Sequence, residues 1–271
     1  MLLLKGAVIG VANIIPGVSG GTMAVVLGIY DRLIDAISGV LTDSSKRFAH
    51  LLLLVLIGVG ALIGLKLLAP LITFALEHHL ELTLLFFMGL ITGSLPAVIR
   101  LSGVKSISLK DMLALAFGMV LVLALGASPA SKDGLGLSPD SISWVTLLIS
   151  GVLAGGAMIV PGVSGSLVLV LLGTYPVILR AVDKLELQVL AIVAIGCGLG
   201  VLFFSILIRW LLQRFSNATH SFIFGLVGAS VIILFRGFPS VEFGVIWGGL
   251  CFLTGAGVAH ASGMVSKPKS I

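Results

Sequence analysis

Residues 13–34 read NIIPGVSGGTMAVVLGIYDRLI and residues 158–179 read MIVPGVSGSLVLVLLGTYPVIL, so one pattern occurs twice in the chain. Both stretches contain PGVSG, and both continue through an apolar segment to leucine, glycine and, one residue further on, tyrosine. A second match relates residues 88–100, MGLITGSLPAVIR, to residues 224–236, FGLVGASVIILFR. Because the two matches follow one another in the same order, the sequence predicts a chain of two homologous halves.

The composition is that of a membrane protein, because 58% of the 271 residues are hydrophobic and only 10% are charged. Soluble domains carry about a quarter of charged residues, and apolar runs of roughly 18 residues or more can cross a bilayer. We therefore expect an all-α polytopic membrane protein with a single membrane domain over the whole chain. Its expected parts are repeat 1 at 1–128, a Gly/Pro/Ser-rich linker at 129–141, repeat 2 at 142–260 and a cytoplasmic tail at 261–271.

Each half is expected to hold a two-part, broken helical element around PGVSG, followed by three transmembrane helices. The predicted spans are residues 51–76, 82–99 and 112–127 in repeat 1, and 187–212, 221–235 and 243–259 in repeat 2. An element that returns to its starting side, followed by three crossings, makes the second half start on the opposite side. The halves would then form an inverted-topology repeat.

Basic residues and the length of the first apolar arm refine this topology. Lys and Arg concentrate in the loops on the N-terminal side, so the positive-inside rule predicts that both termini are cytoplasmic. The arm at residues 2–15 would be only about 21 Å long as a helix, which is short for a bilayer core of roughly 30 Å. We therefore favour a re-entrant motif element, while two full crossings stay open as the alternative.

The paired motifs are the predicted binding site. Interruptions at corresponding positions of two halves indicate the site of a transporter, and broken backbone is tolerated in lipid only where it is buried or lines a polar cavity. A helix that begins at the motif serine would point its free N–H groups at an anion such as phosphate. The candidate residues are Asn13, Pro16, Gly17, Ser19, Gly20, Gly21 and Thr22 in the first motif, and Pro161, Gly162, Ser164, Gly165 and Ser166 in the second.

Close helix packing is the competing interpretation of the small residues. We assign that role to Gly28, Gly58, Gly64 and Gly173. Packing alone does not require the prolines of PGVSG, which remove a backbone donor and end a helix. The duplicated motif therefore favours a binding site.

Four arginines and one lysine near or within the apolar segments are further candidates. Arg100 and Arg236 are equivalent in the second match, and their guanidinium groups could receive a phosphate at opposite faces. Arg32 and Arg180 follow the motif helices and could line the entrances. Each arginine has the alternative role of an anchor or an ion-pair partner at a helix end. Lys66 lies inside an apolar run, where it is either functional or extends its amine to the interface.

Residues 10–34, GVANIIPGVSGGTMAVVLGIYDRLI, resemble the signature of a bacterial membrane family, the undecaprenyl-phosphate translocases called PopT. The family pattern is a lead of small residues, then D/N-x-x-PGVSGGT, then LGIY followed by an acidic residue, and the similarity covers essentially the whole chain. The chain departs from the family at Asn13, where aspartate is common, which puts an ion-coupling role of that position in doubt.

The resemblance implies a transporter in the bacterial inner membrane, not an enzyme. It would return undecaprenyl phosphate from the outer to the inner leaflet by alternating access, with the phosphate at the motif helices and the polyprenyl tail in lipid. A proton or a sodium ion could be coupled to transport, and the oligomeric state stays open. No cofactor, no metal and no nucleic-acid partner is expected.

Two rival functions remain in view at this stage. A transporter or channel for a small soluble anion would share the same motif site. A membrane-embedded lipid phosphatase is less favoured, because the five histidines fall at span ends or in loops and form no catalytic constellation with nearby carboxylates.

Overall fold

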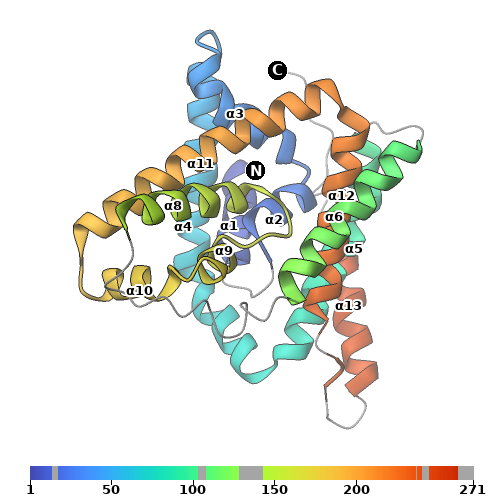
Figure 1. Ribbon diagram of the computed structural model, residues 1–271. Coiled ribbons are helices and arrows are strands. Elements are labelled where there is room, and N and C mark those ends of the chain that lie inside the picture. Colours follow the sequence, from blue (N-terminus) through green and yellow to red (C-terminus); the bar gives the residue numbers. More distant parts are fainter. Residues whose placement is uncertain (14–17, 103–107, 128–142, 236, 240–243, 262–271) are drawn as a thin grey trace.

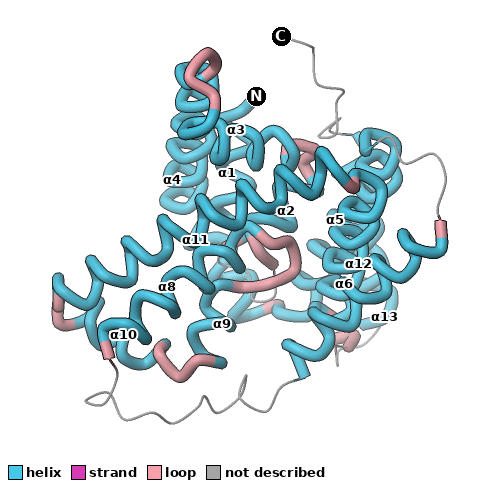
Figure 2. The backbone as a smooth tube through the Cα atoms, turned by 45° about the horizontal axis from the view of Figure 1, so that its top comes forward, coloured by secondary structure: helices cyan, strands magenta, loops and turns pink. Residues whose placement is uncertain are grey.

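The computed structural model describes residues 1–13, 18–102, 108–127, 143–235, 237–239 and 244–261 (Figure 1). The described residues form helices joined by short loops, with no strand among them (Figure 2). This confirms the all-α architecture. The predicted linker at 129–141 and the predicted tail at 261–271, apart from Ala261 at the end of a helix, lie outside the described residues.

The helices of the two halves correspond one to one in chain order. Those of the first half are α1 (Leu2–Ala12), α2 (Gly20–Val26), α3 (Tyr30–Thr42), α4 (Arg47–His78), α5 (Leu80–Ser102) and α6 (Leu109–Ala127). Those of the second half are α8 (Trp144–Ile159), α9 (Gly165–Leu171), α10 (Tyr175–Asp183), α11 (Leu187–Arg214), α12 (Ser216–Leu234) and α13 (Gly244–Ala261).

Five helices among the described residues, α4, α5, α6, α11 and α12, are long and apolar enough to cross a membrane. They confirm five of the six predicted spans. The sixth prediction, at 243–259, falls on α13, a shorter apolar helix in its described part. The chain is therefore a multi-pass membrane protein.

The motif elements have three parts and not the predicted two. The second arm is interrupted at Gly28 and at Gly173, which adopt φ angles of 62° and 69°. At both places the glycine N–H and the following N–H bond back to carbonyls of the preceding helix, which is a glycine-terminated helix stop. In the second half α9 and α10 then meet at 113°, as a broken span or a re-entrant loop. The packing role assigned to these two glycines is wrong, because their task is to end a helix.

Glycines join the first and fourth helices of each half in the same way. A Cβ added to any of these glycines would collide with backbone atoms of the facing helix, so α1 lies directly on α4 and α8 directly on α11. Gly64, predicted to pack, belongs to this set, whereas Gly58 faces open space. The equivalent glycines are Gly6, Gly10, Gly60 and Gly64 in the first half, and Gly151, Gly155, Gly196 and Gly200 in the second.

The remaining long helices pack across the two halves. Helix α5 packs against α13, and α12 packs against α6, again through glycines. Gly89 of α5 faces the carbonyl of Phe252, and its counterpart Gly225 of α12 faces the carbonyl of Leu115. Each half thus contributes one helix to each of these two helix pairs, and equivalent glycines of the two halves lie at the contacts.

The short motif helices differ strongly in burial. Helix α2 lies in the main hydrophobic core, where Met23 and Val26 are fully buried. Its counterpart α9 has no buried residue. In the same sense α3 packs against both α4 and α11, whereas α10 packs against α9 and α11. The protein is therefore closed around the first motif and open around the second.

Candidate functional site

A cavity of about 750 Å³ lies where the two motifs meet. Its walls come from the ends of α6, α8 and α12 and from the start of α5, which surround the beginnings of α2 and α9. The motif residues that line it are Asn13, Ser19, Gly20, Gly162, Ser164, Gly165 and Ser166. The structure therefore brings together two motifs that are far apart in the sequence.

The first motif uses its hydroxyl groups to hold the second motif. Ser19 caps α2 by accepting a hydrogen bond from the N–H of Thr22 at 3.1 Å. The N–H of Gly162 donates to the Thr22 hydroxyl at 2.8 Å and to the Ser19 hydroxyl at 3.2 Å. Thr22 is fully buried and does not line the cavity. In this conformation its hydroxyl has a structural partner.

Backbone of the two motifs also approaches closely. A Cβ at Gly21 would lie 2.6 Å from the carbonyl oxygen of Ile159, just before the second motif, so only glycine fits there. Gly162 has a φ of 79°, and a Cβ there would lie 2.6 Å from the carbonyl oxygen of Leu226. Pro161 is fully buried beside this contact. Pro16 and Gly17 lie outside the described residues.

The second motif leaves its polar groups available to the cavity. Ser164 stands at the N-cap of α9, but its side chain does not cap the helix. Its hydroxyl lies 2.7 Å from that of Ser166, which is exposed. Among the described residues no side chain caps the start of α9, and two hydroxyls stand beside its first N–H groups.

No charged side chain is among the described residues that line this cavity. Its polar groups are hydroxyls, amides and backbone N–H groups, and much of the remaining wall is apolar, including Leu80, Leu84 and Leu125. Sequence reasoning missed two polar lining residues, Tyr175 and Ser230. The repeated leucine-glycine-x-tyrosine pattern was a signal for the tyrosine.

The three predicted arginines that the structure describes, Arg32, Arg100 and Arg180, do not line the cavity. Arg100 is exposed and its Nε donates to the carbonyl of Pro96 at 3.2 Å. Arg180 lies 3.7 Å from Glu186 in an exposed ion pair. Arg32 lines a different pocket. Arg236 lies outside the described residues, and Lys66 is exposed on α4.

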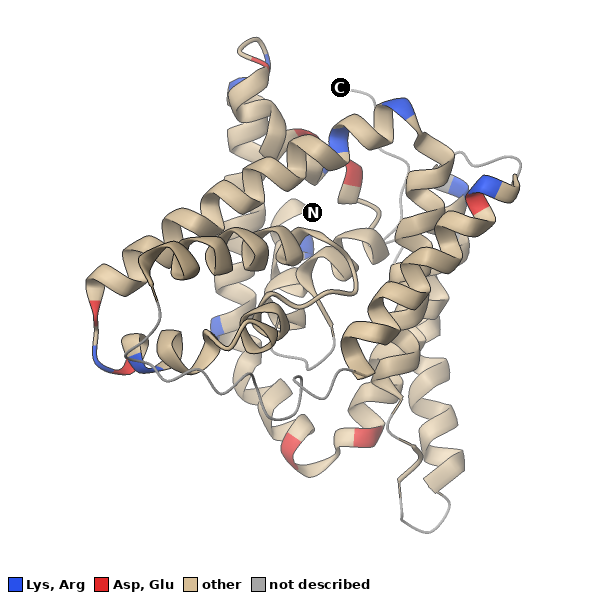
Figure 3. Cartoon of the chain, viewed as in Figure 1, with Lys and Arg blue, Asp and Glu red and all other residues tan. Residues whose placement is uncertain are grey.

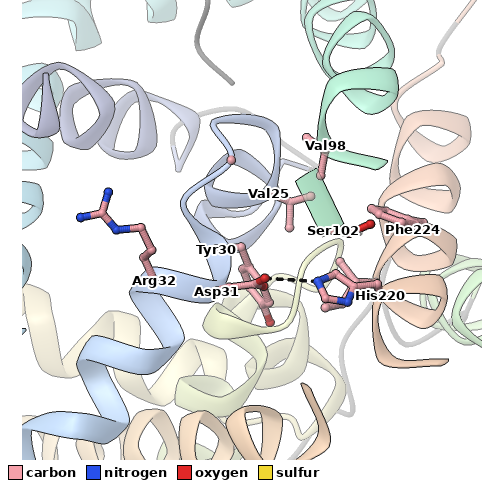
Figure 4. Close-up of a pocket in the computed structure, with 10 residues that line it drawn as sticks. Val25, Tyr30, Asp31, Arg32, Val98, Ser102, His220 and Phe224 are labelled. Carbon is pink, nitrogen blue, oxygen red and sulfur yellow. Dashed lines mark hydrogen bonds and ion pairs between the residues drawn. The ribbon is translucent and has the colours of Figure 1, made fainter. Parts of the chain in front are cut away.

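A smaller pocket of about 110 Å³ lies where α3 meets α5 and α12 (Figure 4). In it the imidazole Nε2 of His220 lies 3.2 Å from a carboxylate oxygen of Asp31. The other ring nitrogen of His220 contacts the carbonyl of Ser216 at 2.8 Å, which fixes the ring. The guanidinium of Arg32 points away from this pair (Figure 4).

A second charged contact joins the same helix to the second half. Arg209 of α11 lies 2.9 Å from a carboxylate oxygen of Asp35 on α3 and donates to the hydroxyl of Thr42 at 2.9 Å. We call the Asp31–His220 and Asp35–Arg209 contacts the α3 latch. The corresponding positions of α10 are Pro176 and Arg180, and Arg180 pairs with Glu186 of its own half.

Many Lys and Arg lie along the upper edge of the molecule, which includes the α11–α12 corner, and a second group lies at the lower left near α10 (Figure 3). The α3 latch lies at this edge, because Arg209 is in the last turns of α11 and His220 is in the second turn of α12. The described residues contain no group of three or more His, Cys, Asp and Glu side chains that could hold a metal ion.

The fold defines a polytopic membrane protein whose two halves enclose a cavity between broken helices, and the described residues that line this cavity carry no charged side chain. The chain belongs to the undecaprenyl phosphate translocase-like family, whose profile matches residues 9–242. This confirms the resemblance seen in the sequence.

Two curated relatives carry the name polyprenyl-phosphate transporter. The protein from Vibrio cholerae is 35% identical over 240 residues, which are 83% of this chain and 73% of the relative. The protein from Staphylococcus aureus is 31% identical over 250 residues, which are 88% of this chain and 87% of the relative. No solved structure matches the chain significantly.

Proposed function

We propose that this protein transports a polyprenyl phosphate, undecaprenyl phosphate, from the outer to the inner leaflet of the bacterial cytoplasmic membrane. The observation that carries the proposal is the cavity of about 750 Å³ lined by both PGVSG motifs. The family and the names of the two relatives support the substrate class.

The phosphate is proposed to bind at the second motif in this conformation. The hydroxyls of Ser164 and Ser166 and the uncapped N–H groups at the start of α9 are the available donors. A site of neutral donors can hold a phosphate by hydrogen bonds and can release it without breaking an ion pair. The apolar wall suits the first units of the tail, whose remainder stays in the bilayer.

Transport by alternating access is supported by the unequal burial of the motifs. Helix α2 is enclosed and the α3 latch holds α3 to α11 and α12, whereas α9 borders the open cavity. The two halves have equivalent packing, so exchanging their conformations would close the present cavity and open one at the other end. We propose that the latch and both termini lie on the cytoplasmic side, and the positive-inside rule, applied to the basic residues near the latch, supports this orientation.

A hydrolytic role fits the cavity poorly. A membrane phosphatase needs a nucleophile with a base beside it, or a metal centre. The described lining residues include serines and a tyrosine but no histidine and no carboxylate that could activate them. We therefore propose a transporter and not an enzyme.

The experiment is binding of undecaprenyl phosphate to the purified protein in detergent, with inorganic phosphate and an uncharged polyprenol as competitors. We expect tight binding that needs both the phosphate and the tail. Equal binding of free phosphate would instead identify a site for a small soluble anion, and absence of lipid binding would overturn the proposal.

A further inference from the structure

Four of the ten residues that line the small pocket stand at repeat positions whose counterparts line the large cavity. The matched stretches make Val25 equivalent to Val170, and Tyr30 equivalent to Tyr175. The second match makes Val98 equivalent to Leu234 and, continued four residues toward the N-terminus, His220 equivalent to Leu84. In each of these pairs one member lines the small pocket and the other lines the large cavity, namely Val25, Tyr30, Val98 and His220 against Val170, Tyr175, Leu234 and Leu84.

The two spaces also lie at opposite ends of the same helices. Helix α5 lines the large cavity with Leu84 near its start and the small pocket with Val98 near its end. Helix α12 does the reverse, with Leu234 at its end in the large cavity and His220 near its start in the small pocket. The small pocket is thus the place at which an exchange of conformations between the halves would open the second cavity.

The two equivalent tyrosines have opposite environments. Tyr175 borders the open cavity and is 38% exposed. Tyr30 is 5% exposed, and its buried hydroxyl has no hydrogen-bond partner among the described residues. A buried hydroxyl without a partner is costly and calls for an explanation. A ligand that binds only when this pocket is open would supply the missing acceptor.

We infer that the small pocket is the closed form of a second phosphate site, at which the hydroxyl of Tyr30 and the imidazole of His220 bind the lipid headgroup on the latch side. The inference rests on the proposed function and assigns residues to its other end state. Tyr175 would serve the headgroup in the conformation described, and Tyr30 would serve it after the exchange.

The chemistry of the two ends then differs in a definite way. The large cavity has Leu84 where the small pocket has His220, and Pro176 stands at the position equivalent to Asp31. While the pocket is closed, a carboxylate oxygen of Asp31 lies 3.2 Å from Nε2 of His220 and takes the place of a ligand there. Opening separates α3 from α12, which frees the imidazole to donate to a phosphate oxygen. The carboxylate of Asp31 would repel that phosphate, so it must move away with α3.

The test is Tyr30→Phe, compared with Tyr175→Phe and the unchanged protein. Transfer of a polyprenyl phosphate between leaflets is measured in proteoliposomes, and binding of the same lipid is measured in detergent. We expect Tyr30→Phe to slow transfer by about tenfold, the effect of losing one hydrogen bond to a charged group. Binding to the conformation described should change less than twofold for Tyr30→Phe and weaken for Tyr175→Phe.

The melting temperature separates this role from a structural one. Because the Tyr30 hydroxyl has no partner in the closed pocket, Tyr30→Phe should not lower the melting temperature. Slow transfer with unchanged melting supports the site, and transfer at the unchanged rate overturns it. If the variant slows entry of inorganic phosphate but not lipid transfer, the ligand is a free anion and the lipid site is overturned. If the unchanged protein moves no polyprenyl phosphate, the proposed function itself fails.

Discussion

The backbone N–H of Gly162 donates a hydrogen bond to the hydroxyl of Thr22 at 2.8 Å, and this bond joins two motifs that lie 140 residues apart. The oxygen of Ser19 accepts from the same N–H at 3.2 Å. The two motifs therefore form one structural unit. Both line the cavity, and the first motif also holds the second through the hydroxyls of Ser19 and Thr22. Changes to the contacts between the motifs should therefore affect stability, and changes to the hydroxyls of the second motif should affect binding.

Thr22→Val should destabilise the protein. Valine keeps the branched shape but removes the acceptor, which leaves the Gly162 N–H with the longer bond to Ser19 alone. We expect a loss of about 1–2 kcal/mol and a lower melting temperature in detergent. Thr254→Val is the matched control, because the exposed Thr254 hydroxyl bonds only to a carbonyl of its own helix. Equal effects of both variants would contradict the proposed link between the motifs.

Gly162→Ala should lower the stability of the protein more than alanine at a glycine of a long helix that faces open space. At Gly162 the φ of 79° disfavours a side chain, and the added carbon would lie 2.6 Å from the carbonyl oxygen of Leu226. Gly58→Ala is the control, since nothing lies within 4 Å of its added carbon and alanine favours a helix by about 1 kcal/mol. Thermal melting should therefore fall for the first variant and stay or rise for the second.

The double change Ser164→Ala with Ser166→Ala should weaken binding of the phosphate lipid without unfolding the protein. Neither hydroxyl caps α9, and each bonds only to the other among the described residues, so little structure depends on them. We expect about a tenfold loss of affinity or more, measured with labelled undecaprenyl phosphate. Ser143→Ala, which removes the cap of α8 outside the cavity, is the control. Unchanged affinity in a folded double variant would remove the second motif from the site.

A companion variant, Ser19→Ala with Ser164→Ala, removes one hydroxyl from each motif. It should weaken binding too, but Ser19 also caps α2 and accepts from Gly162. Its melting temperature should therefore fall, whereas that of the Ser164 and Ser166 variant should not. The pair of variants separates the holding motif from the binding motif.

Asp35→Asn should loosen α3. The substitution removes one charge of the contact with Arg209 at 2.9 Å, which ties α3 to the second half. We expect faster hydrogen exchange in the backbone of α3, with no change in α10. Glu186→Gln is the control, because it breaks the exposed pair with Arg180 at 3.7 Å, and exposed pairs contribute little. Protection of α3 that does not change would show that the latch does not hold the closed side.

The sequence allowed prediction of the helical membrane architecture, of five spans and of the meeting of the two motifs. Hydropathy and the repeated proline and glycine indicate these features directly, because backbone N–H and C=O groups inside a bilayer must be hydrogen-bonded within the protein. The break after α2 was missed, since a glycine in an apolar run serves equally well for packing and for ending a helix. Only the positive φ at Gly28 and Gly173 distinguishes the two roles.

The inequality of the motifs was not predicted, although part of it stands in the sequence. Thr22, which accepts from Gly162, has Leu167 as its counterpart, and Ser166, which lines the cavity, has Gly21. Ser19 and Ser164 occupy equivalent positions and both line the cavity, yet among the described residues only Ser19 accepts a hydrogen bond from the partner motif. Such a difference belongs to the conformation and not to the local sequence. The contact of Asp31 with His220 was also missed, because nothing in the sequence around either residue indicates a partner 189 residues away.

The glycine-lined contacts of α1 with α4 and of α8 with α11 also determine how the molecule can deform. The helices of each pair are so close that not even a methyl group fits between them. If one helix slid along the other, its larger side chains would collide with the backbone of its neighbour. Each pair must travel as one rigid body. We therefore expect the displacement to occur at the positive-φ joints at Gly28 and Gly173. If each helix pair rotates as a rigid unit about one of these joints, the cavity can open to the other side with little repacking of the core.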